Sequence, residues 1–243
     1  PRDPANAKKV LRRAHELGAN FFDTAESYGP HTDEMIIAEA MHPYPKDLVI
    51  GTKCGLVRPK PSRWDSDGRP EKLRKDLEGS LKRLKLDCLH LWQLHAPDPK
   101  VPFEDQVGVL ADAQRQGKVR HVGLSNVSVK QLEQARKIVP IVSVQNRYNV
   151  GDRSSEDVLQ ACEKLGIAFL PWYPLGDGAA LKNRKIKEVA KRLKTTPAQV
   201  AIAWLLAKSP VMLPIPGTSS VAHLEENMKA ASVRLDDEDI ASL

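Results

Sequence analysis

The chain has 243 residues, of which 41% are hydrophobic, 28% charged and 5% aromatic. That apolar share supports a full hydrophobic core, which excludes disordered and collagen-like chains, and no apolar run approaches the roughly 20 residues that cross a bilayer. The net charge of +6 comes from lysines and arginines spread over helical patterns, so we expect neither nucleic acid nor a membrane as a partner.

The three cysteines, Cys54, Cys88 and Cys162, are odd in number and show no CxxC spacing. This pattern is typical neither of a disulfide framework nor of a zinc site, so we expect no bound metal. It suits a reducing compartment. The first residues are polar and no signal peptide is visible, so we expect a cytoplasmic protein.

Stretches with helical periodicity alternate with short apolar or β-branched runs along the chain. The first half predicts helices at 4–17, 32–41, 71–85 and 103–116 and strands at 20–23, 48–53, 88–95 and 119–125. The second half predicts helices at 128–138, 155–165, 184–194, 197–208, 221–230 and 236–243 and strands at 141–145, 167–172 and 211–215. Strand–helix alternation at this spacing indicates right-handed βαβ units and a parallel sheet.

These seven predicted strands suit either a doubly wound sheet or an α/β barrel of the (β/α)8 TIM type. A doubly wound nucleotide-binding sheet would show a glycine-rich phosphate loop after its first strand, and neither G-x-G-x-x-G nor a Walker loop is present. No linker or repeat divides the chain, so we predict a single barrel domain over 1–243. Because seven parallel strands would leave open edges, we expect the first strand to lie in about 30 to 40 further N-terminal residues.

Four ionisable side chains fall where such a barrel carries its chemistry, at the C-terminal ends of strands and in the loops that follow. Asp23, Lys53 and His95 end predicted strands, and Tyr28 lies in the loop after the first of these strands. Each residue alone could be structural. A lysine that ends an apolar strand, however, needs a buried partner, and Asp23 is the obvious candidate.

Together the four residues predict carbonyl reduction. A tyrosine with a pKa near 10 is a poor acid at neutral pH unless a nearby cation such as Lys53 stabilises its phenolate. His95 can orient a substrate carbonyl toward Tyr28, which delivers the proton to the developing alkoxide as a general acid. None of these residues donates a hydride, so a nicotinamide cofactor is required.

The sequence also resembles the aldo-keto reductase family. The matching segments occur in the family's order from near residue 4 to the end, at Asn20–Gly29, Thr52–Lys53, Leu91–Pro97, Gly123–Asn126, Val144–Asn146 and Leu213–Thr218. The resemblance implies a (β/α)8 barrel that reduces aldehydes or ketones with NADPH, and a catalytic tetrad of Asp23, Tyr28, Lys53 and His95. The C-terminal segment is most similar to bacterial pyridoxal-reductase-like members.

The resemblance further implies contacts with the cofactor. Ser125, Asn126 and Gln145 match residues that hold the nicotinamide carboxamide. Trp172 matches the aromatic that stacks on the nicotinamide ring, with plain core packing as the alternative. Other expected cofactor contacts are Pro174, Leu175, Gly217, Thr218, Ser219, His223, Glu226 and Asn227.

The adenosine end departs from the family pattern. Where many members carry a Lys-Ser pair and a later arginine around the 2′-phosphate, this chain has Gly217, Thr218 and His223. Hydroxyls and backbone N–H groups at the start of the following helix can still bind a phosphate. NADPH is therefore expected, and NADH stays open.

The substrate is expected to be a small aldehyde or ketone, held by the loops around 54–68, 96–103 and 174–184. Candidate substrate contacts are Cys54, Trp64 and Tyr173.

Two other functions stay open beside the reductase. Potassium-channel β-subunits resemble reductases and keep the tetrad while acting mainly by binding a partner, so a cofactor-binding regulatory subunit with little turnover is one alternative. A phosphate-handling barrel isomerase or lyase is the other, and it would not need Ser125, Asn126, Gln145 or Trp172.

Overall fold

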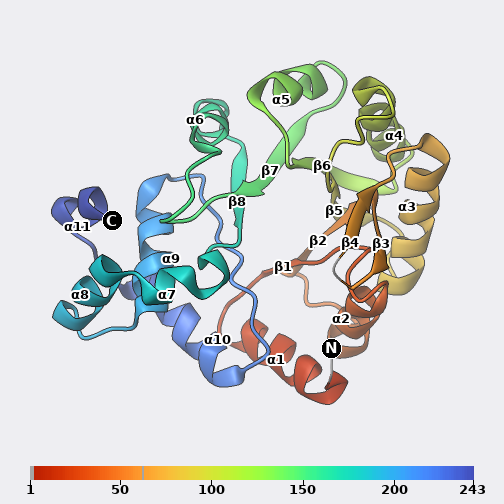
Figure 1. The fold of residues 1–243 in the computed structure, drawn as a ribbon. Coiled ribbons are helices and arrows are strands. Elements are labelled where there is room, and N and C mark those ends of the chain that lie inside the picture. Colours follow the sequence, from red (N-terminus) through yellow and green to blue (C-terminus); the bar gives the residue numbers. More distant parts are fainter. Residues whose placement is uncertain (1–2, 62) are drawn as a thin grey trace. The chain divides into compact units, whose positions relative to one another are not determined.

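Helices and strands alternate through the computed structural model, which describes residues 3–61 and 63–243 (Figure 1). The chain divides into two compact units, Pro1–Ser143 and Val144–Leu243, with strand β7 (Ile141–Arg147) at the boundary. The elements of the first unit are α1 (Pro4–Glu16), β1 (Phe21–Asp23), α2 (Thr32–Met41), β2 (Val49–Cys54), β3 (Leu56–Lys60), β4 (Arg63–Ser66), α3 (Pro70–Leu84), β5 (Leu89–Leu94), α4 (Phe103–Arg115), β6 (Val119–Ser125) and α5 (Val129–Arg136).

The first unit is built on the parallel strands β1, β2, β5 and β6, which are hydrogen-bonded in that order. Asp23 pairs with Gly51, Lys53 with Gln93, and Gln93 in turn with Gly123. This register brings the C-terminal ends of the four strands to one edge of the sheet, where parallel α/β folds place their chemistry.

Local sequence explains where the helices of this unit begin and end. Asp3 caps α1 by accepting a hydrogen bond from the backbone N–H of Asn6, at 2.9 Å. Helix α3 begins at Pro70, whose fixed φ suits a first helical position. Leu73, Leu77 and Leu84 recur at helical spacing on α3, and burial of this stripe against the sheet favours the helix.

The second unit is mainly helical. After β7 come α6 (Glu156–Leu165), β8 (Ala168–Trp172), η1 (Gly176–Gly178), α7 (Ala179–Lys182), α8 (Arg184–Arg192), α9 (Pro197–Lys208), α10 (Val221–Met228), η2 (Lys229–Ser232) and α11 (Asp237–Ser242). Helix α9 is apolar on nearly every side and is buried at the centre of this unit, where Trp204 stacks on Tyr148 with ring centroids 5.9 Å apart. A capping box between Thr196 and Gln199 begins it.

Three segments differ from the sequence prediction. The segment 174–184, expected as a loop, contains η1 and α7. The strand expected at 211–215 is reduced to one isolated bridge between Phe169 and Met212, because Pro214 and Pro216 have no N–H with which to extend a ladder. The segment 54–68, expected as a loop, contains the antiparallel hairpin of β3 and β4. Pro59 and Pro61 mask the strand pattern there, since proline is tolerated at sheet edges and turns but is depleted in strands generally.

Among the described residues no helix combines the length and the hydropathy that a membrane span requires. The single-domain prediction for 1–243 and the expectation of further N-terminal residues stay predictions.

Candidate active site

The loop between β1 and α2 carries Tyr28, and its backbone is bound to the neighbouring strand β2. The N–H of Thr24 donates to the Gly51 carbonyl at 2.8 Å, and the N–H of Glu26 donates to the Lys53 carbonyl at 3.2 Å. These bonds continue the parallel ladder beyond the end of β1. The loop therefore lies along β2 and brings Tyr28 close to Lys53.

Lys53 is fully buried and fully partnered. Its Nζ donates to Asp23 Oδ2 at 2.6 Å and to the Thr24 carbonyl at 2.8 Å. Burial by itself lowers the pKa of Lys53, but the Asp23 carboxylate, with a contribution from Tyr28, outweighs burial and the pKa is raised. Lys53 is therefore a permanent ammonium ion at neutral pH.

Tyr28 lies next to this ammonium, with Lys53 Nζ 5.0 Å from the centroid of the phenol ring. Burial raises the pKa of Tyr28, Lys53 opposes the rise, and the net direction is upward. The phenol consequently keeps its proton at neutral pH. The adjacent cation would stabilise the phenolate that remains once the proton is transferred.

His95 completes the group, with its ring 5.6 Å from that of Tyr28 and nearly perpendicular to it. Burial, followed by the charge of Lys53, lowers the pKa of His95 well below its ordinary value, so the imidazole is neutral. Its Nδ1 is buried and has no hydrogen-bond partner among the residues that the structure describes. A buried ring nitrogen of this kind is suited to a ligand. The structure thus brings all four predicted tetrad residues together within the first unit.

Ser125 ends β6 and Asn126 follows it, at the same edge of the sheet. Asn126 adopts a left-handed backbone conformation with a φ of 57°, which asparagine tolerates better than most residues. Its Nδ2 donates to the His95 carbonyl at 2.9 Å and to Ser125 Oγ at 3.1 Å. These bonds orient the amide and the hydroxyl beside His95.

The β3–β4 hairpin supplies Trp64, which is 42% exposed. Its ring centroid lies 6.0 Å from that of Tyr28 and 6.3 Å from that of His95, and the Arg58 guanidinium lies 4.8 Å from the Trp64 ring. The structure thus places Trp64 beside Tyr28 and His95, and its contact with the substrate stays a prediction. The hairpin that brings it there was not predicted.

Cys54 is placed differently from Trp64. Its thiol is buried and bonds the Gln93 carbonyl at 3.5 Å, and burial raises its pKa well above the ordinary value. Adjacent strand residues point to opposite faces, so Cys54 faces away from the side on which Lys53 meets Tyr28. The structure therefore argues against the predicted contact between Cys54 and the substrate.

An open cavity of about 780 Å³ lies at the loop between β5 and α4. Its lining includes Pro97, Lys100, Phe103 and Asn126. The cavity thus lies at the predicted substrate loop 96–103. Asn126, which also lines the cavity, connects it to His95 by donating a hydrogen bond to the His95 carbonyl.

In the second unit, Trp172 ends β8 and Tyr173 follows it, and the two rings pack edge to face with centroids 4.9 Å apart. The Arg147 guanidinium lies 5.5 Å from the Trp172 ring and 5.7 Å from the Tyr173 ring. Tyr173 is exposed, and its contact with the substrate stays a prediction. The other predicted cofactor contacts near this strand are a buried Gln145, a buried Pro174 and a half-buried Leu175.

The predicted phosphate-binding run lies before α10. Ser220 caps this helix by accepting a hydrogen bond from the N–H of His223 at 3.4 Å, and its own N–H donates to Thr218 Oγ1 at 3.1 Å. Gly217 and Ser219 are exposed, and a Cβ added at Gly217 would meet no other atom within 4 Å. Glu226 is engaged within the protein, where it accepts a hydrogen bond from Thr196 at 2.6 Å. Asn227, one residue further on, is buried.

The sequence analysis did not single out Glu26, which lies two positions before Tyr28 in the loop between β1 and α2. Its carboxylate contacts Lys72 of α3 and His31. The partner on α3 is 46 positions away in the chain, so no local pattern could reveal the contact.

Comparisons with known proteins place this chain in a family. The model of the aldo/keto reductase family matches residues 1–243. The chain is 48% identical to an uncharacterized oxidoreductase of Schizosaccharomyces pombe over 244 residues, covering 100% of this chain and 79% of that protein. It is 44% identical to pyridoxine 4-dehydrogenase of Escherichia coli over 250 residues, covering 100% of this chain and 87% of the relative.

Solved structures show the same fold. A thermostable aldo-keto reductase crystallised with the inhibitor epalrestat superposes with a TM-score of 0.84 at 35% identity, over 97% of this chain and 85% of that one. The glycerol dehydrogenase of Gluconobacter oxydans superposes with a TM-score of 0.90 at 24% identity, over 98% of this chain and 83% of that one. An aldo-keto reductase of Klebsiella pneumoniae in complex with NADPH reaches 0.85 at 23% identity, over 98% and 84%. The predicted fold class, the (β/α)8 barrel of these enzymes, is confirmed.

The match over the whole chain and the two relatives above 40% identity lead to one conclusion. The chain belongs to the aldo/keto reductase family of NAD(P)H-dependent oxidoreductases.

Proposed function

We propose that this protein reduces aldehydes or ketones to alcohols with NADPH, and that Tyr28 is the general acid of the reaction. The observation that carries the proposal is the buried Lys53 ammonium, 2.6 Å from Asp23 and 5.0 Å from the ring of Tyr28. A lysine kept charged in this way is what a phenol needs if it is to release a proton near neutral pH.

When bound, the nicotinamide supplies the hydride that adds to the carbonyl carbon. The electron pair of the carbonyl π bond then moves to the oxygen, and Tyr28 transfers its proton there. The phenolate that remains is stabilised by Lys53, which Asp23 holds in place. Neutral His95 donates a hydrogen bond to the same oxygen before and during the transfer.

The residues present fit a dinucleotide cofactor. In the first unit, the unpartnered Nδ1 of His95 and the oriented groups of Ser125 and Asn126 suit a ligand with amide donors and acceptors. In the second unit, Gln145 and the flat ring of Trp172 suit the nicotinamide, and Pro174 and Leu175 follow Trp172 in the chain.

The phosphate end of the cofactor would be held by the run Gly217 to Ser220 and by the first turn of α10, through hydroxyls and backbone N–H groups. His223 lies in that turn and Asn227 further along the helix. The bond between Glu226 and Thr196 leaves Glu226 less free for the cofactor than the resemblance implies. Because His223 stands here in place of a permanently charged side chain, NADH stays an alternative cofactor. A competition experiment between NADH and NADPH would show which one the protein prefers.

For the substrate we propose a small carbonyl compound bounded by Trp64 and by the loop 96–103. Tyr173 is the corresponding candidate in the second unit. The name of the E. coli relative, pyridoxine 4-dehydrogenase, makes pyridoxal a reasonable member of a substrate panel. We also propose a cytoplasmic location, which the free cysteines Cys54, Cys88 and Cys162 support.

The test is NADPH oxidation followed at 340 nm with 4-nitrobenzaldehyde and with pyridoxal. We expect turnover that Tyr28→Phe reduces by about 100- to 10,000-fold. Tyr44→Phe is the matched control, because it removes a hydroxyl that bonds the Leu84 carbonyl and its activity should stay at the native level. Tight NADPH binding without Tyr28-dependent turnover would overturn the proposal and favour a regulatory subunit. Absence of NADPH binding would favour an isomerase or lyase.

A further inference from the structure

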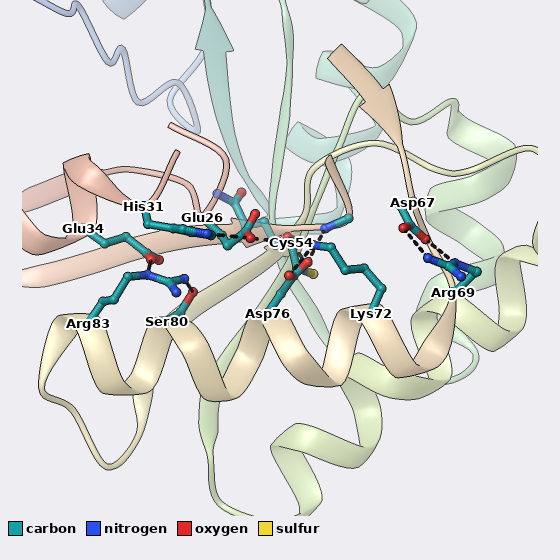
Figure 2. A network of polar contacts seen from close by, with 12 residues as sticks. Glu26, His31, Glu34, Cys54, Asp67, Arg69, Lys72, Asp76, Ser80 and Arg83 are labelled. Carbon is teal, nitrogen blue, oxygen red and sulfur yellow. Dashed lines mark hydrogen bonds and ion pairs between the residues drawn. The ribbon is translucent and has the colours of Figure 1, made fainter. Parts of the chain in front are cut away.

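Helix α3 directs a row of polar side chains toward the loop that carries Tyr28 (Figure 2). Lys72, Asp76, Ser80 and Arg83 recur at intervals of three or four residues and so share one face of the helix. Two carboxylates, Glu26 from the loop and Glu34 from α2, meet this face. The cluster lies on the opposite side of β2 from the contact between Lys53 and Tyr28.

Two of the acids in the cluster have close hydrogen bonds that explain their burial. Glu34 accepts from Thr52 Oγ1 and from Arg83 Nε, both at 2.6 Å. Asp76 accepts from Lys72 and from the N–H of Gly55, the latter at 3.2 Å. Buried carboxylates that are satisfied in this way are structural.

Glu26 differs from these acids, although it is only 8% exposed. Its Oε1 lies 3.6 Å from Lys72 Nζ and 3.6 Å from His31 Nδ1. Both distances are too long for a good hydrogen bond, so among the described residues the charge of Lys72 is what holds this carboxylate. An ion pair of this kind exists while Glu26 is ionised and is lost when it is protonated.

The backbone places Glu26 at the base of the turn that presents Tyr28. The N–H of Glu26 donates to Lys53, and its carbonyl accepts from the N–H of His31 at 2.9 Å. Between these points the N–H of Tyr28 donates to the Ala25 carbonyl at 3.1 Å. The ion pair between Glu26 and Lys72 therefore links this turn to α3.

We propose that Glu26 is a positioning residue of the reductase: its ionised carboxylate, attracted by Lys72, holds the loop that carries Tyr28, and proton delivery by Tyr28 slows when that carboxylate is neutral. This inference rests on the proposed function, because it concerns the rate at which Tyr28 gives up its proton. It adds a pH dependence that the tetrad does not supply, since His95 is neutral throughout the physiological range.

The electrostatic surroundings of Glu26 support a titration at neutral pH. Burial raises its pKa, Asp76 raises it further and Glu34 adds to the rise, while Lys72 and Arg83 oppose it, and the result is about 7. The Cys54 thiol and the His31 ring also lie close to this carboxylate. Glu26 is therefore less stable as an anion in the folded chain than in the unfolded chain.

The proton transfer separates a positioning role from a structural one. Because the pKa of Glu26 is raised, Glu26→Gln should be more stable than native protein above pH 7 in either case. Only a positioning role predicts that the more stable variant is also slower in the proton transfer.

The experiment compares the kcat and KM of native protein and Glu26→Gln between pH 5.5 and 8.5, with NADPH and 4-nitrobenzaldehyde. We expect native kcat to rise through an apparent pKa near 7 and the variant to lack this rise. At pH 8 its kcat should be roughly 10- to 100-fold lower, with KM changed by less than about twofold and a larger solvent isotope effect, because a misplaced acid slows proton transfer rather than binding. Glu71→Gln, an exposed acid on the same helix, is the matched control and should behave as native protein.

Lys72→Gln is the second variant, which decides the question if Glu26→Gln fails to fold. Removal of the cation should move the rise in kcat to higher pH, because Lys72 is the nearest group that lowers the pKa of Glu26. An unchanged rise in Glu26→Gln or in Lys72→Gln would overturn the inference and leave the proposed function intact. Native protein without Tyr28-dependent turnover would overturn both.

Discussion

Lys53 Nζ donates a hydrogen bond of 2.6 Å to Asp23 Oδ2 at a point where the lysine side chain has no exposed surface. Asp23 ends β1 and Lys53 lies at the end of β2, and the parallel pairing of these strands brings them together. A buried ion pair of this kind adds little net stability to the protein. Removal of one partner alone is nevertheless strongly destabilising, because the other charge is left buried and unpaired.

Asp23→Asn should therefore be strongly destabilising, by roughly 3–5 kcal/mol, because it leaves the Lys53 ammonium buried without a carboxylate. Urea denaturation at pH 7 measures the free energy of unfolding. Asp47→Asn is the control, since Asp47 pairs with His15 at the surface and should change stability by less than about 1 kcal/mol. Equal effects of the two substitutions would contradict the buried-pair interpretation.

The raised pKa of Glu26 predicts how stability changes with pH. An acid whose pKa is higher in the folded chain than its ordinary 4.5 binds more protons when folded, so its contribution favours the folded state below pH 4.5 and is lost between pH 4.5 and about 7. Glu26→Gln should remove this loss and raise the free energy of unfolding at pH 8 by about 1–3 kcal/mol relative to native protein. A difference that does not grow from pH 5 to pH 8 would contradict the titration of Glu26.

His95 predicts the opposite slope at lower pH. Burial and Lys53 depress its pKa in the folded chain, so below the ordinary value of 6.5 the unfolded chain takes up a proton that the folded chain refuses. Stability should fall as the pH drops through 6.5, and His95→Gln should lack this component while keeping a hydrogen-bond donor. Thermal melting of both proteins between pH 5 and 8 provides the comparison, and parallel curves would contradict the prediction.

Trp64 offers a wall of the substrate site that can be removed without disturbing the tetrad, because the ring is half in solvent. Trp64→Ala should raise KM for 4-nitrobenzaldehyde by roughly 5- to 10-fold, equivalent to about 1 kcal/mol of lost aromatic contact, with a smaller effect on kcat. Arg58→Gln keeps the ring and removes the cation above it, and its KM should stay within about twofold of native. An unchanged KM in Trp64→Ala would remove Trp64 from the site.

Cys54 and Cys88 should differ in their reaction with iodoacetamide. The Cys54 thiol is buried and its pKa is raised well above the ordinary value, whereas Cys88 is partly exposed. Peptide mapping by mass spectrometry after brief alkylation of folded protein should find Cys88 modified and Cys54 intact. Modification of Cys54 at a comparable rate would show that the folded protein exposes this thiol.

Much of the fold and of the catalytic group could be predicted from the chain. Helix ends at Pro70 and at the capping box of Thr196, and apolar runs such as Val119 to Ser125, are local signals that depend on a few neighbouring residues. The tetrad could be predicted because strand ends in parallel sheets meet at one edge, so position along the chain already indicates proximity. The prediction of a strand at 211–215 was wrong for a reason equally visible in the sequence, because Pro214 and Pro216 have no N–H with which to extend a ladder.

What the sequence by itself determined is therefore the order of the elements, the parallel sheet and the four ionisable residues at its edge. The tertiary structure decided which of the candidate residues lie together: it brought Trp64 beside Tyr28 by a hairpin, turned Cys54 away, and set Lys72 beside Glu26. It also decided the protonation of His95 and Glu26. These properties arise from burial and from charges supplied by distant segments, and neither is encoded within the span of a local pattern.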